Sequence, residues 1–368
     1  MRERLDSLRG QLHQACERIG RRVQIMEVCG THTVSIFRSG IRAMLPGNLR
    51  LISGPGCPVC VTAQRHVDAA IELAGRESVI IATYGDMVRV PGKSISLEKL
   101  RAEGACIRVV NSAKTALEIA RENPKSPVVF LGIGFETTAP ATAATVLEAN
   151  RDGVENFSVL MCHKLVVPAM RTLLDAGDVP LDGFLCPGHV SVIIGVEAYR
   201  PIVERYGKAC VVAGFEPEPI LRAIVALMQQ IADGRPALQN AYSAVVSDDG
   251  NPVALELIDR VFEPADAPWR QLGVIPQSGL ELRPPYRRFD ALERFNIELG
   301  PDADEGACRC GEVILGKVEP HECPLFGTAC TPINPIGPCM VSSEGTCSAW
   351  YKYSRFARGG AAATRGET

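Results

Sequence analysis

Cysteine is the residue whose number and spacing first point to chemistry in this sequence. The chain has 368 residues and 14 cysteines. Six of the cysteines lie near the end of the chain, with prolines beside or between them: Cys308, Cys310, Cys323, Cys330, Cys339 and Cys347. Prolines and glycines fix the turns of such a loop and leave backbone amides free to hydrogen-bond sulfur. The tail therefore predicts a site for a metal or an inorganic cluster.

Four of these cysteines have the spacing expected for a [4Fe–4S] cluster. Cys323, Cys330, Cys339 and Cys347 are separated by gaps of six, eight and seven residues. Structural zinc is an alternative, but zinc ribbons use paired cysteines two to four residues apart, and these gaps are wider. Free thiols are a third interpretation. The choice of the four ligands stays open, because Cys308 or Cys310 could replace one of them.

A Cys-x-x-Cys pair lies in the glycine-rich turn Gly54–Cys60, directly before an expected helix. The amides at a helix N-terminus stabilise the leading thiol as a thiolate, which suits reversible disulfide exchange. Cys57 and Cys60 are therefore predicted to be a redox-active dithiol. Half of a zinc site is the alternative, although the chain has no second Cys-x-x-Cys to complete one.

A thiol and an imidazole lie three residues apart at Cys29 and His32. Both side chains are suitable ligands for ferrous iron, so the pair is a candidate iron site. An isolated Cys-x-x-His is more often structural, and the iron site gains weight only if Cys57 and Cys60 come close to it. Glu136 and His189 also follow expected strands, and they could line a crevice as functional polar contacts or be satisfied structural residues.

Composition limits the other classes of function. The formal charge of −3 gives no general attraction to nucleic acid or to anionic lipid. No run approaches the ~18 apolar residues that a membrane span needs, and the charged first 20 residues do not resemble a signal peptide. We therefore expect a cytoplasmic protein, in which the thiols serve metal or redox chemistry rather than a disulfide framework. Phosphate-loop and dinucleotide-binding glycine patterns are incomplete, so nucleotide binding has no support.

Short apolar segments alternate with helical ones, which is the pattern of parallel sheets in α/β proteins. The expected strands are Leu49–Ser53, Val79–Thr83, Cys106–Val110, Val128–Ile133, Ser158–Cys162, Gly183–Cys186 and Ala209–Ala213. The expected helices between them include Ala63–Ala74, Ala113–Arg121, Ala139–Asn150, Val167–Ala176 and Pro219–Ile231.

The predicted organisation has five parts. They are an N-terminal helix (residues 1–25), two α/β domains (26–145 and 146–258), a C-terminal [4Fe–4S] domain (259–356) that begins in proline-rich irregular sequence, and a disordered tail (357–368). A Gly-Phe-Glu turn follows a strand in each α/β half, at Gly134 and Gly214. This repetition is consistent with two related domains, although three matching residues can arise by chance.

Six sequence blocks, taken together, resemble the HypD family, whose members help to assemble the iron centre of [NiFe]-hydrogenases. The blocks are CGTHT (Cys29–Thr33), GPGCPVC (Gly54–Cys60), GFETT (Gly134–Thr138), PGHVS (Pro187–Ser191), GFEP (Gly214–Pro217) and the cysteine-rich tail (Cys323–Cys347). They occur in this order across nearly the whole chain.

The resemblance implies a fold of two related α/β domains with a cluster domain. It also implies a scaffold that holds iron together with a HypC-type small chaperone while a HypE-type partner delivers cyanide-derived ligands and carbon monoxide is added. Cys29, with His32 beside it, would be the iron site. Cys57 and Cys60 would relay electrons, and the tail cysteines would hold the [4Fe–4S] cluster.

Three functional hypotheses remain at this point. The first is the redox-active assembly scaffold for an Fe(CN)2CO group, which would not be a conventional turnover enzyme. The second is a self-contained, cluster-dependent thiol-disulfide oxidoreductase. The third is a zinc-stabilised binding module, which would be colourless.

Overall fold

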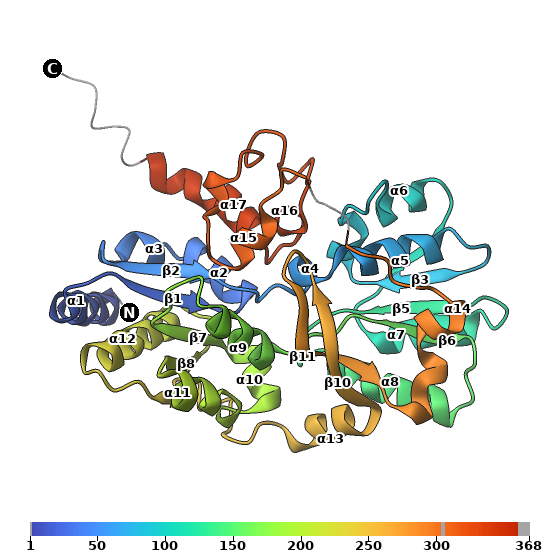
Figure 1. Cartoon of the computed structure of the whole chain (residues 1–368), viewed down its shortest axis with the longest axis horizontal. Helices are drawn as coiled ribbons and strands as arrows, with labels where there is room; N and C mark the ends of the chain where they lie inside the picture. Colours follow the sequence, from blue (N-terminus) through green and yellow to red (C-terminus); the bar gives the residue numbers. More distant parts are fainter. Residues whose placement is uncertain (1, 303–305, 360–368) are drawn as a thin grey trace.

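Two parallel β-sheets form the frame of the protein (Figure 1). The computed structural model describes residues 2–302 and 306–359. The first sheet has the order β2 (Leu49–Ser53), β1 (Val23–Glu27), β7 (Gly183–Pro187), β8 (Ala209–Ala213) and β9 (Leu238–Asn240). The second sheet has the order β4 (Cys106–Val109), β3 (Ile80–Thr83), β5 (Val128–Gly132) and β6 (Phe157–Met161). The α/β class expected from the sequence is therefore confirmed.

The central strands are buried on both faces, as parallel strands covered by helices must be. Every residue of β5, β6, β7 and β8 is buried. Helices around the first sheet are α1 (Arg2–Ile19), α2 (Gly30–Arg38), α3 (Ile41–Met44), α9 (Val166–Ala176), α10 (Gly188–Ile194), α11 (Arg200–Tyr206) and α12 (Pro217–Ala232). Helices around the second sheet are α5 (Gln64–Ala74), α6 (Leu97–Ala102), α7 (Ala113–Glu122), α8 (Ala139–Arg151), α13 (Pro252–Val261) and α14 (Ala291–Phe295).

The strands are shared between the sheets differently from the expected division at residues 145 and 146. Strands β1 and β2 belong to the first sheet, the next four strands along the chain (β3 to β6) form the second sheet, and β7 belongs to the first sheet again. Ile25 of β1 then pairs with Gly183 of β7. The second α/β unit is thus inserted into the first, because the hydrogen-bonding partner of β1 lies far along the chain.

The proline-rich segment after residue 260 is an antiparallel hairpin, not the irregular sequence expected. Strands β10 (Phe262–Trp269) and β11 (Gly273–Leu282) form a two-stranded sheet, with single bridges to Thr62 and Lys164 at Trp269 and Gly279. Each strand is therefore an edge strand, where a proline need not lose a ladder hydrogen bond. The hairpin lies between the two sheets, with Phe262 in the core of the second sheet and Trp269 in the core that the two units share. It therefore joins the α/β units rather than belonging to a separate C-terminal domain.

A cysteine-rich unit follows and lies above the junction of the two sheets (Figure 1). Its helices are α15 (Cys310–Ile314), α16 (Pro338–Val341) and α17 (Thr346–Gly359). Helix α17 continues three residues into the tail expected to be disordered, and residues 360–368 of that tail lie outside the described residues. In the described part of the chain, no helix is both long enough and apolar enough to cross a bilayer.

Candidate functional site

Four sequence blocks meet at one edge of the first sheet. Strand β1 ends before Cys29, β2 before Gly54, β7 before Gly188, and β8 before Gly214. These four strands are adjacent and parallel, so the turns at their carboxyl ends lie side by side. The sheet thus brings together residues that are as much as 185 positions apart in the chain.

The turns at Cys29 and Gly56 are in direct backbone contact. The amide of Gly30 donates a hydrogen bond to the carbonyl oxygen of Gly56 at 3.2 Å. A β-carbon added to Gly56 would lie only 2.3 Å from the backbone nitrogen of Cys29, so this approach requires glycine. The expected proximity of Cys29 to the Cys57–Cys60 turn is therefore present in the structure.

Cys29 is the N-cap residue of α2 and is 9% exposed. Burial raises the pKa of its thiol to about 11, the nearby amides of His32 and Thr31 act in the opposite direction, and the Glu344 carboxylate raises the pKa further. The free thiol is thus protonated at neutral pH. A metal ion bound here would have to displace that proton.

His32 is fully buried, and its Nε2 lies 2.9 Å from the carbonyl oxygen of Gly214. Burial lowers the pKa of this imidazole to about 4, so the ring is neutral and Nε2–H donates to the carbonyl oxygen. Its Nδ1 then carries a free lone pair, and it has no hydrogen-bond partner among the described residues. The orientation of His32 leaves one nitrogen available as a ligand.

Phe215 links the two histidines of this edge. Its ring centroid lies 4.8 Å from that of His32 and 4.0 Å from that of His189. His189 is exposed, whereas His32 is buried. His189 is therefore placed at the solvent side of the edge that carries Cys29.

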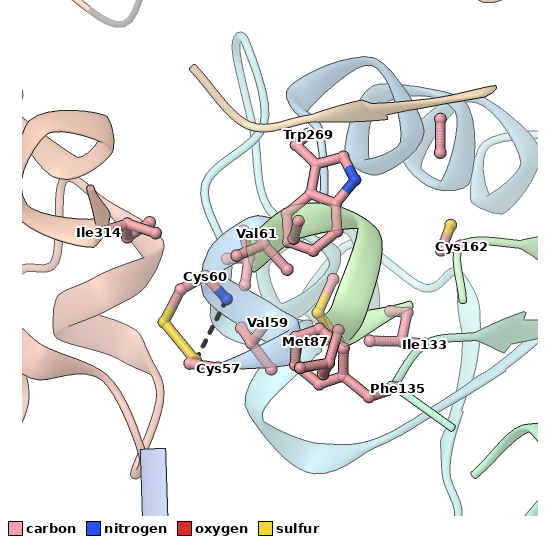
Figure 2. Packing of buried hydrophobic residues seen from close by; sticks show 14 of the residues in the cluster. Cys57, Val59, Cys60, Val61, Met87, Ile133, Phe135, Cys162, Trp269 and Ile314 are labelled. Atoms are coloured by element: carbon pink, nitrogen blue, oxygen red, sulfur yellow. Dashed lines mark hydrogen bonds between the residues drawn. A yellow bond between two sulfur atoms is a disulfide. The ribbon is translucent and has the colours of Figure 1, made fainter. Parts of the chain in front are cut away.

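Cys57 and Cys60 form a disulfide at the start of the short helix α4 (Pro58–Val61) (Figure 2). Cys57 is the N-cap residue, and its sulfur accepts a hydrogen bond from the amide of Cys60 at 3.2 Å. Both cysteines are buried, at 6% and 1% exposure. The pair thus begins a short helix of its own, whereas the helix expected after it, α5 (Gln64–Ala74), starts four residues beyond Cys60. Figure 2 shows the apolar side chains around it, among them Val59, Met87, Phe135 and Trp269.

All six cysteines of the tail line one apolar cavity, which we call the thiol cavity. Its lining includes Cys308, Cys310, Cys323, Cys330, Cys339 and Cys347. A β-carbon on Gly337 would lie 2.7 Å from the sulfur of Cys308, so glycine lets the 330–339 loop close over the Cys308–Cys310 turn. Spacing alone favoured four of these six residues as ligands, and the structure gathers all six.

The thiols in this cavity interact with one another. Hydrogen-bonding contacts with Cys310 and Cys347 keep the pKa of Cys339 well below its usual range. Contact with Cys308, and then with Cys339, raises the pKa of Cys310, and contact with Cys339 raises that of Cys347. A sulfur-rich, apolar, proline-bounded donor set of this kind fits an iron–sulfur cluster. Among residues 2–302 and 306–359, no three Cys, His, Asp or Glu side chains are already arranged around a single metal ion.

Helix α4 connects the thiol cavity with the sheet edge. It contacts α15, which begins at Cys310, and α16, which contains Cys339. Figure 2 shows the disulfide facing the segment that carries Ile314 of α15. The Cys57–Cys60 pair therefore lies between the cysteine-rich unit and the turn that carries Cys29.

Glu344 joins the cysteine-rich unit directly to the Cys29 turn, and the sequence analysis assigned it no role. Its Oε1 accepts a hydrogen bond from Thr31 Oγ1 at 2.6 Å, and a β-carbon on Gly30 would lie 2.6 Å from the backbone oxygen of Glu344. The only signal in the sequence was its position inside the cysteine-rich block. No carboxylate motif marks it.

Glu136 lies elsewhere, in the turn after β5 of the second sheet. Its Oε1 accepts a hydrogen bond from the amide of Val166 at 3.0 Å, and its buried Oε2 has no partner in the described structure. Burial raises the pKa of this carboxyl to about 7. No hydrogen bond or ring contact within the described residues joins Glu136 to His189, which follows β7 of the first sheet.

Lys164 is a further buried polar residue that the sequence analysis did not single out. It follows β6 and is 2% exposed, and burial lowers the pKa of its ammonium group to about 8. Its neighbour His163 contacts Thr142 Oγ1 at 3.0 Å. Both residues follow the apolar strand β6 (Phe157–Met161). No sequence pattern distinguishes a polar side chain that is buried at the end of such a strand from an exposed one, so the sequence did not identify them.

Replacement of Glu136 by glutamine is expected to change the pH dependence of stability. The raised pKa means that the folded protein holds a proton that the unfolded chain releases above pH ~4.5. Glu136 therefore contributes about 3 kcal/mol to the free energy of unfolding at pH values below ~4.5. This contribution is lost as the pH rises to about 7. Glu136→Gln should melt at a higher temperature than the wild type at pH 8, and the difference should shrink toward pH 5.

This prediction is checked by melting curves of both proteins from pH 5 to pH 8. Glu98→Gln is the control, because that carboxylate is exposed. A melting-temperature difference that stays constant with pH would show that Glu136 is ionised throughout.

Comparison with known proteins gives consistent matches over this whole arrangement. The profile described as "HypD: Hydrogenase formation hypA family" matches residues 3–354. The chain is similar to the hydrogenase maturation factor HypD of Azotobacter vinelandii, with 47% identity over 342 residues that cover 91% of this chain and 90% of that protein. It is equally similar to the HypD of Escherichia coli K12, with 47% identity over 334 residues and 90% of each chain covered. A putative hydrogenase expression/formation protein of Methanocaldococcus jannaschii is 43% identical over 345 residues, covering 94% of this chain and 96% of that protein.

Proposed function

The chain belongs to the HypD family of hydrogenase maturation factors, and from that membership we propose that it is a redox-active scaffold for assembly of the Fe(CN)2CO group of [NiFe]-hydrogenases. In this proposal it holds iron together with a HypC-type chaperone and accepts cyanide-derived ligands from a HypE-type partner. The observation that carries the proposal is the position of helix α4. It contacts the thiol cavity on one side, and its turn touches the backbone of Cys29 on the other.

The thiol cavity is the proposed site of a [4Fe–4S] cluster. Cys323, Cys330, Cys339 and Cys347 are the proposed ligands, and Cys308 and Cys310 are close enough to compete with them. The apolar lining and the low pKa of Cys339 favour binding of iron by thiolate. When bound, such a cluster would supply single electrons.

The buried disulfide is the proposed short-range relay. Reduction of the Cys57–Cys60 bond takes two electrons and two protons and gives two thiols. Both sulfurs are nearly inaccessible to solvent, which protects the pair from external thiols and disulfides. This burial supports the scaffold over the self-contained oxidoreductase, because a disulfide substrate would have to reach the leading thiol Cys57, which is only 6% exposed.

Cys29 and His32 are the proposed iron-binding residues. Cys29 offers a thiol that becomes a ligand on losing its proton, and the lone pair on His32 Nδ1 has no other partner among the described residues. Their burial would keep water from the metal. The exposed His189 at the same edge is proposed to face the incoming partner protein.

Iron and sulfide analysis after anaerobic purification tests the proposed cluster. We expect about four iron and four sulfide ions per chain and a brown protein. Cys339→Ser should lose most of this iron, because Cys339 is the most buried of the four proposed ligands. Cys106→Ser is the control, since Cys106 is partly exposed on the edge strand β4 and lies outside the thiol cavity.

The same measurement in Cys308→Ser and Cys310→Ser shows which four of the six thiols bind iron. A colourless wild-type protein that contains zinc but no sulfide would contradict the proposal and support the binding module. Full iron content in Cys339→Ser would exclude Cys339 as a ligand.

A further inference from the structure

The most exposed large apolar side chain among the described residues lies on the loop between Cys330 and Cys339, two cysteines that line the thiol cavity. Ile333 is 94% exposed, compared with 66% for Val253 and 57% for Val274. The loop of residues 331–336 is short and rigid, because Asn334 hydrogen-bonds to both Thr331 and Ala329 and prolines flank Ile333. Burial of Ile333 against a partner would remove a large apolar surface from water.

This loop, which we call the 331–336 loop, is joined directly to the proposed cluster ligands. The amide of Ile336 donates a hydrogen bond to the sulfur of Cys330 at 3.3 Å. Gly337 contacts Cys308, and Cys339 follows two residues later. A protein seated on Ile333 would therefore contact a loop whose two ends, at Cys330 and Gly337, line the thiol cavity.

Positive charge surrounds the loop, although the loop itself has none. The sequence from Cys323 to Ser343 contains no Asp, Glu, Lys or Arg. A hollow of about 210 Å³ lies beside Ile333 and is lined by Arg89, Lys99 and one acid, Glu98. Lys93 is exposed next to this hollow. Arg89 donates a hydrogen bond to the carbonyl oxygen of Pro332 in the loop, and none of the three cations forms an ion pair within residues 2–302 and 306–359. The charges of the exposed Lys93 and Lys99 are therefore available to a partner.

The thiol cavity is closed where it meets the dithiol. Helices α15 and α16 contact α4 there, and Cys57 and Cys60 are buried. The 331–336 loop instead presents Ile333 to solvent, and Arg89 and Lys99 line the hollow beside it.

We propose that the 331–336 loop and the adjacent Arg89–Lys99 rim form the docking surface for a small acidic electron-carrier protein of the ferredoxin class. The inference rests on the proposed cluster. An exposed apolar residue surrounded by unpaired cations is complementary to an acidic protein, which it would attract and then bind at Ile333. One electron would leave the reduced carrier, which becomes oxidised, and enter the chain through this loop. Two such transfers, with two protons, match the reduction of one disulfide.

Binding of an acidic plant-type [2Fe–2S] ferredoxin to the full-length protein, measured by calorimetry at low and high salt, tests this proposal. Ile333→Asp should weaken binding at least tenfold, and so should Lys93→Glu combined with Lys99→Glu. Raising the salt concentration should weaken binding to the wild type and reduce the difference between the charge variant and the wild type. The matched controls are Val253→Asp and the pair Lys114→Glu with Lys125→Glu, which lie on exposed parts of the second-sheet unit and should bind like the wild type.

Cluster reduction followed by absorbance distinguishes failure of docking from failure of the proposed cluster. Dithionite should reduce the wild type and all variants at the same rate, whereas reduced ferredoxin should reduce Ile333→Asp at least tenfold more slowly than the wild type. Absence of ferredoxin binding to the wild type, or equal binding by all variants, would overturn the docking surface. If the variants bound a HypC-type chaperone more weakly but bound ferredoxin like the wild type, the surface would belong to another partner. That result would also overturn the proposed ferredoxin docking. A protein without iron and sulfide would instead contradict the proposed cluster.

Discussion

Cys57→Ala and Cys60→Ala are each expected to reduce hydrogenase maturation by at least ~100-fold while leaving the iron and sulfide content of the protein unchanged. A single remaining thiol cannot form the intramolecular disulfide that stores two electrons, so the relay is lost entirely. Both residues lie outside the lining of the thiol cavity, and neither should be needed for cluster binding. Hydrogenase activity in a deletion strain carrying each variant, together with iron analysis of the purified proteins, measures the two effects separately.

Cys162→Ala is the matched control for these variants. Cys162 is also a buried cysteine in the same apolar core, as Figure 2 shows, but it has no neighbouring thiol to form a disulfide with. It should support maturation. Normal maturation by Cys57→Ala or Cys60→Ala would exclude the relay. Loss of iron from either variant would show that α4 supports the thiol cavity structurally.

Cys29→Ala is expected to abolish maturation to the same extent through a different defect. The variant should keep the cluster and the disulfide but lose the additional iron, about one ion per complex, that the wild type holds together with a HypC-type chaperone. The reason is that Cys29 supplies the free thiol of its turn, whereas the neighbouring Cys57 and Cys60 are joined to each other. Co-purification with the chaperone, followed by iron analysis with and without Cys29, measures this loss.

Cys16→Ala provides the comparison for Cys29→Ala. Cys16 is buried in α1 against the opposite part of the first sheet and should leave iron and partner binding intact. If the Cys29→Ala complex retained all of its iron, the metal would have to be held elsewhere. If the variant failed to bind the chaperone at all, Cys29 would be part of the partner interface as well.

The strands of the two sheets could largely be predicted from the sequence, because most are short runs of apolar residues that parallel sheets bury on both faces. Leu49–Ser53 and Ala209–Ala213 were predicted with the same bounds that the structure shows. Strand β1 was missed because Gln24 and Glu27 interrupt its apolar character. Glu27 is fully buried, and an ion pair with Arg42 at 3.6 Å accompanies that burial. A charged residue with a distant partner cannot be recognised as a core residue by local pattern.

The hairpin β10–β11 was missed for a related reason. Pro264 and Pro268 argue against a strand as long as the number of neighbouring strands is unknown, because proline cannot donate a ladder hydrogen bond. In a two-stranded sheet each strand has an unpaired edge, and proline is tolerated there. The distribution of strands between the two sheets was equally inaccessible. It depends on which distant strand completes the pairing of β1, and hydrophobic periodicity does not encode that choice.

For the candidate site, the sequence predicted which residues take part more accurately than how they are arranged in space. Cys29 and the Cys57–Cys60 pair were expected to come together, and the structure brings their backbones into contact through Gly56. Glu136 and His189 were considered as polar contacts in a crevice between the units or as structural residues, and the structure places them after strands of the two different sheets. Cys308 and Cys310 could not be placed from spacing, because their distance from the other tail thiols depends on how Gly337 packs.

The insertion of the second sheet into the first makes the Cys29 turn dependent on late parts of the chain. During synthesis Cys29 emerges early, but its neighbouring strand β7 begins at Gly183, its aromatic neighbour is Phe215, and the carboxylate that contacts Thr31 belongs to Glu344. Contacts so distant in sequence form slowly and only after the later segments are available. A partly made polypeptide therefore cannot present a finished iron-binding edge, and the order of translation itself delays metal capture until nearly the entire protein has left the ribosome.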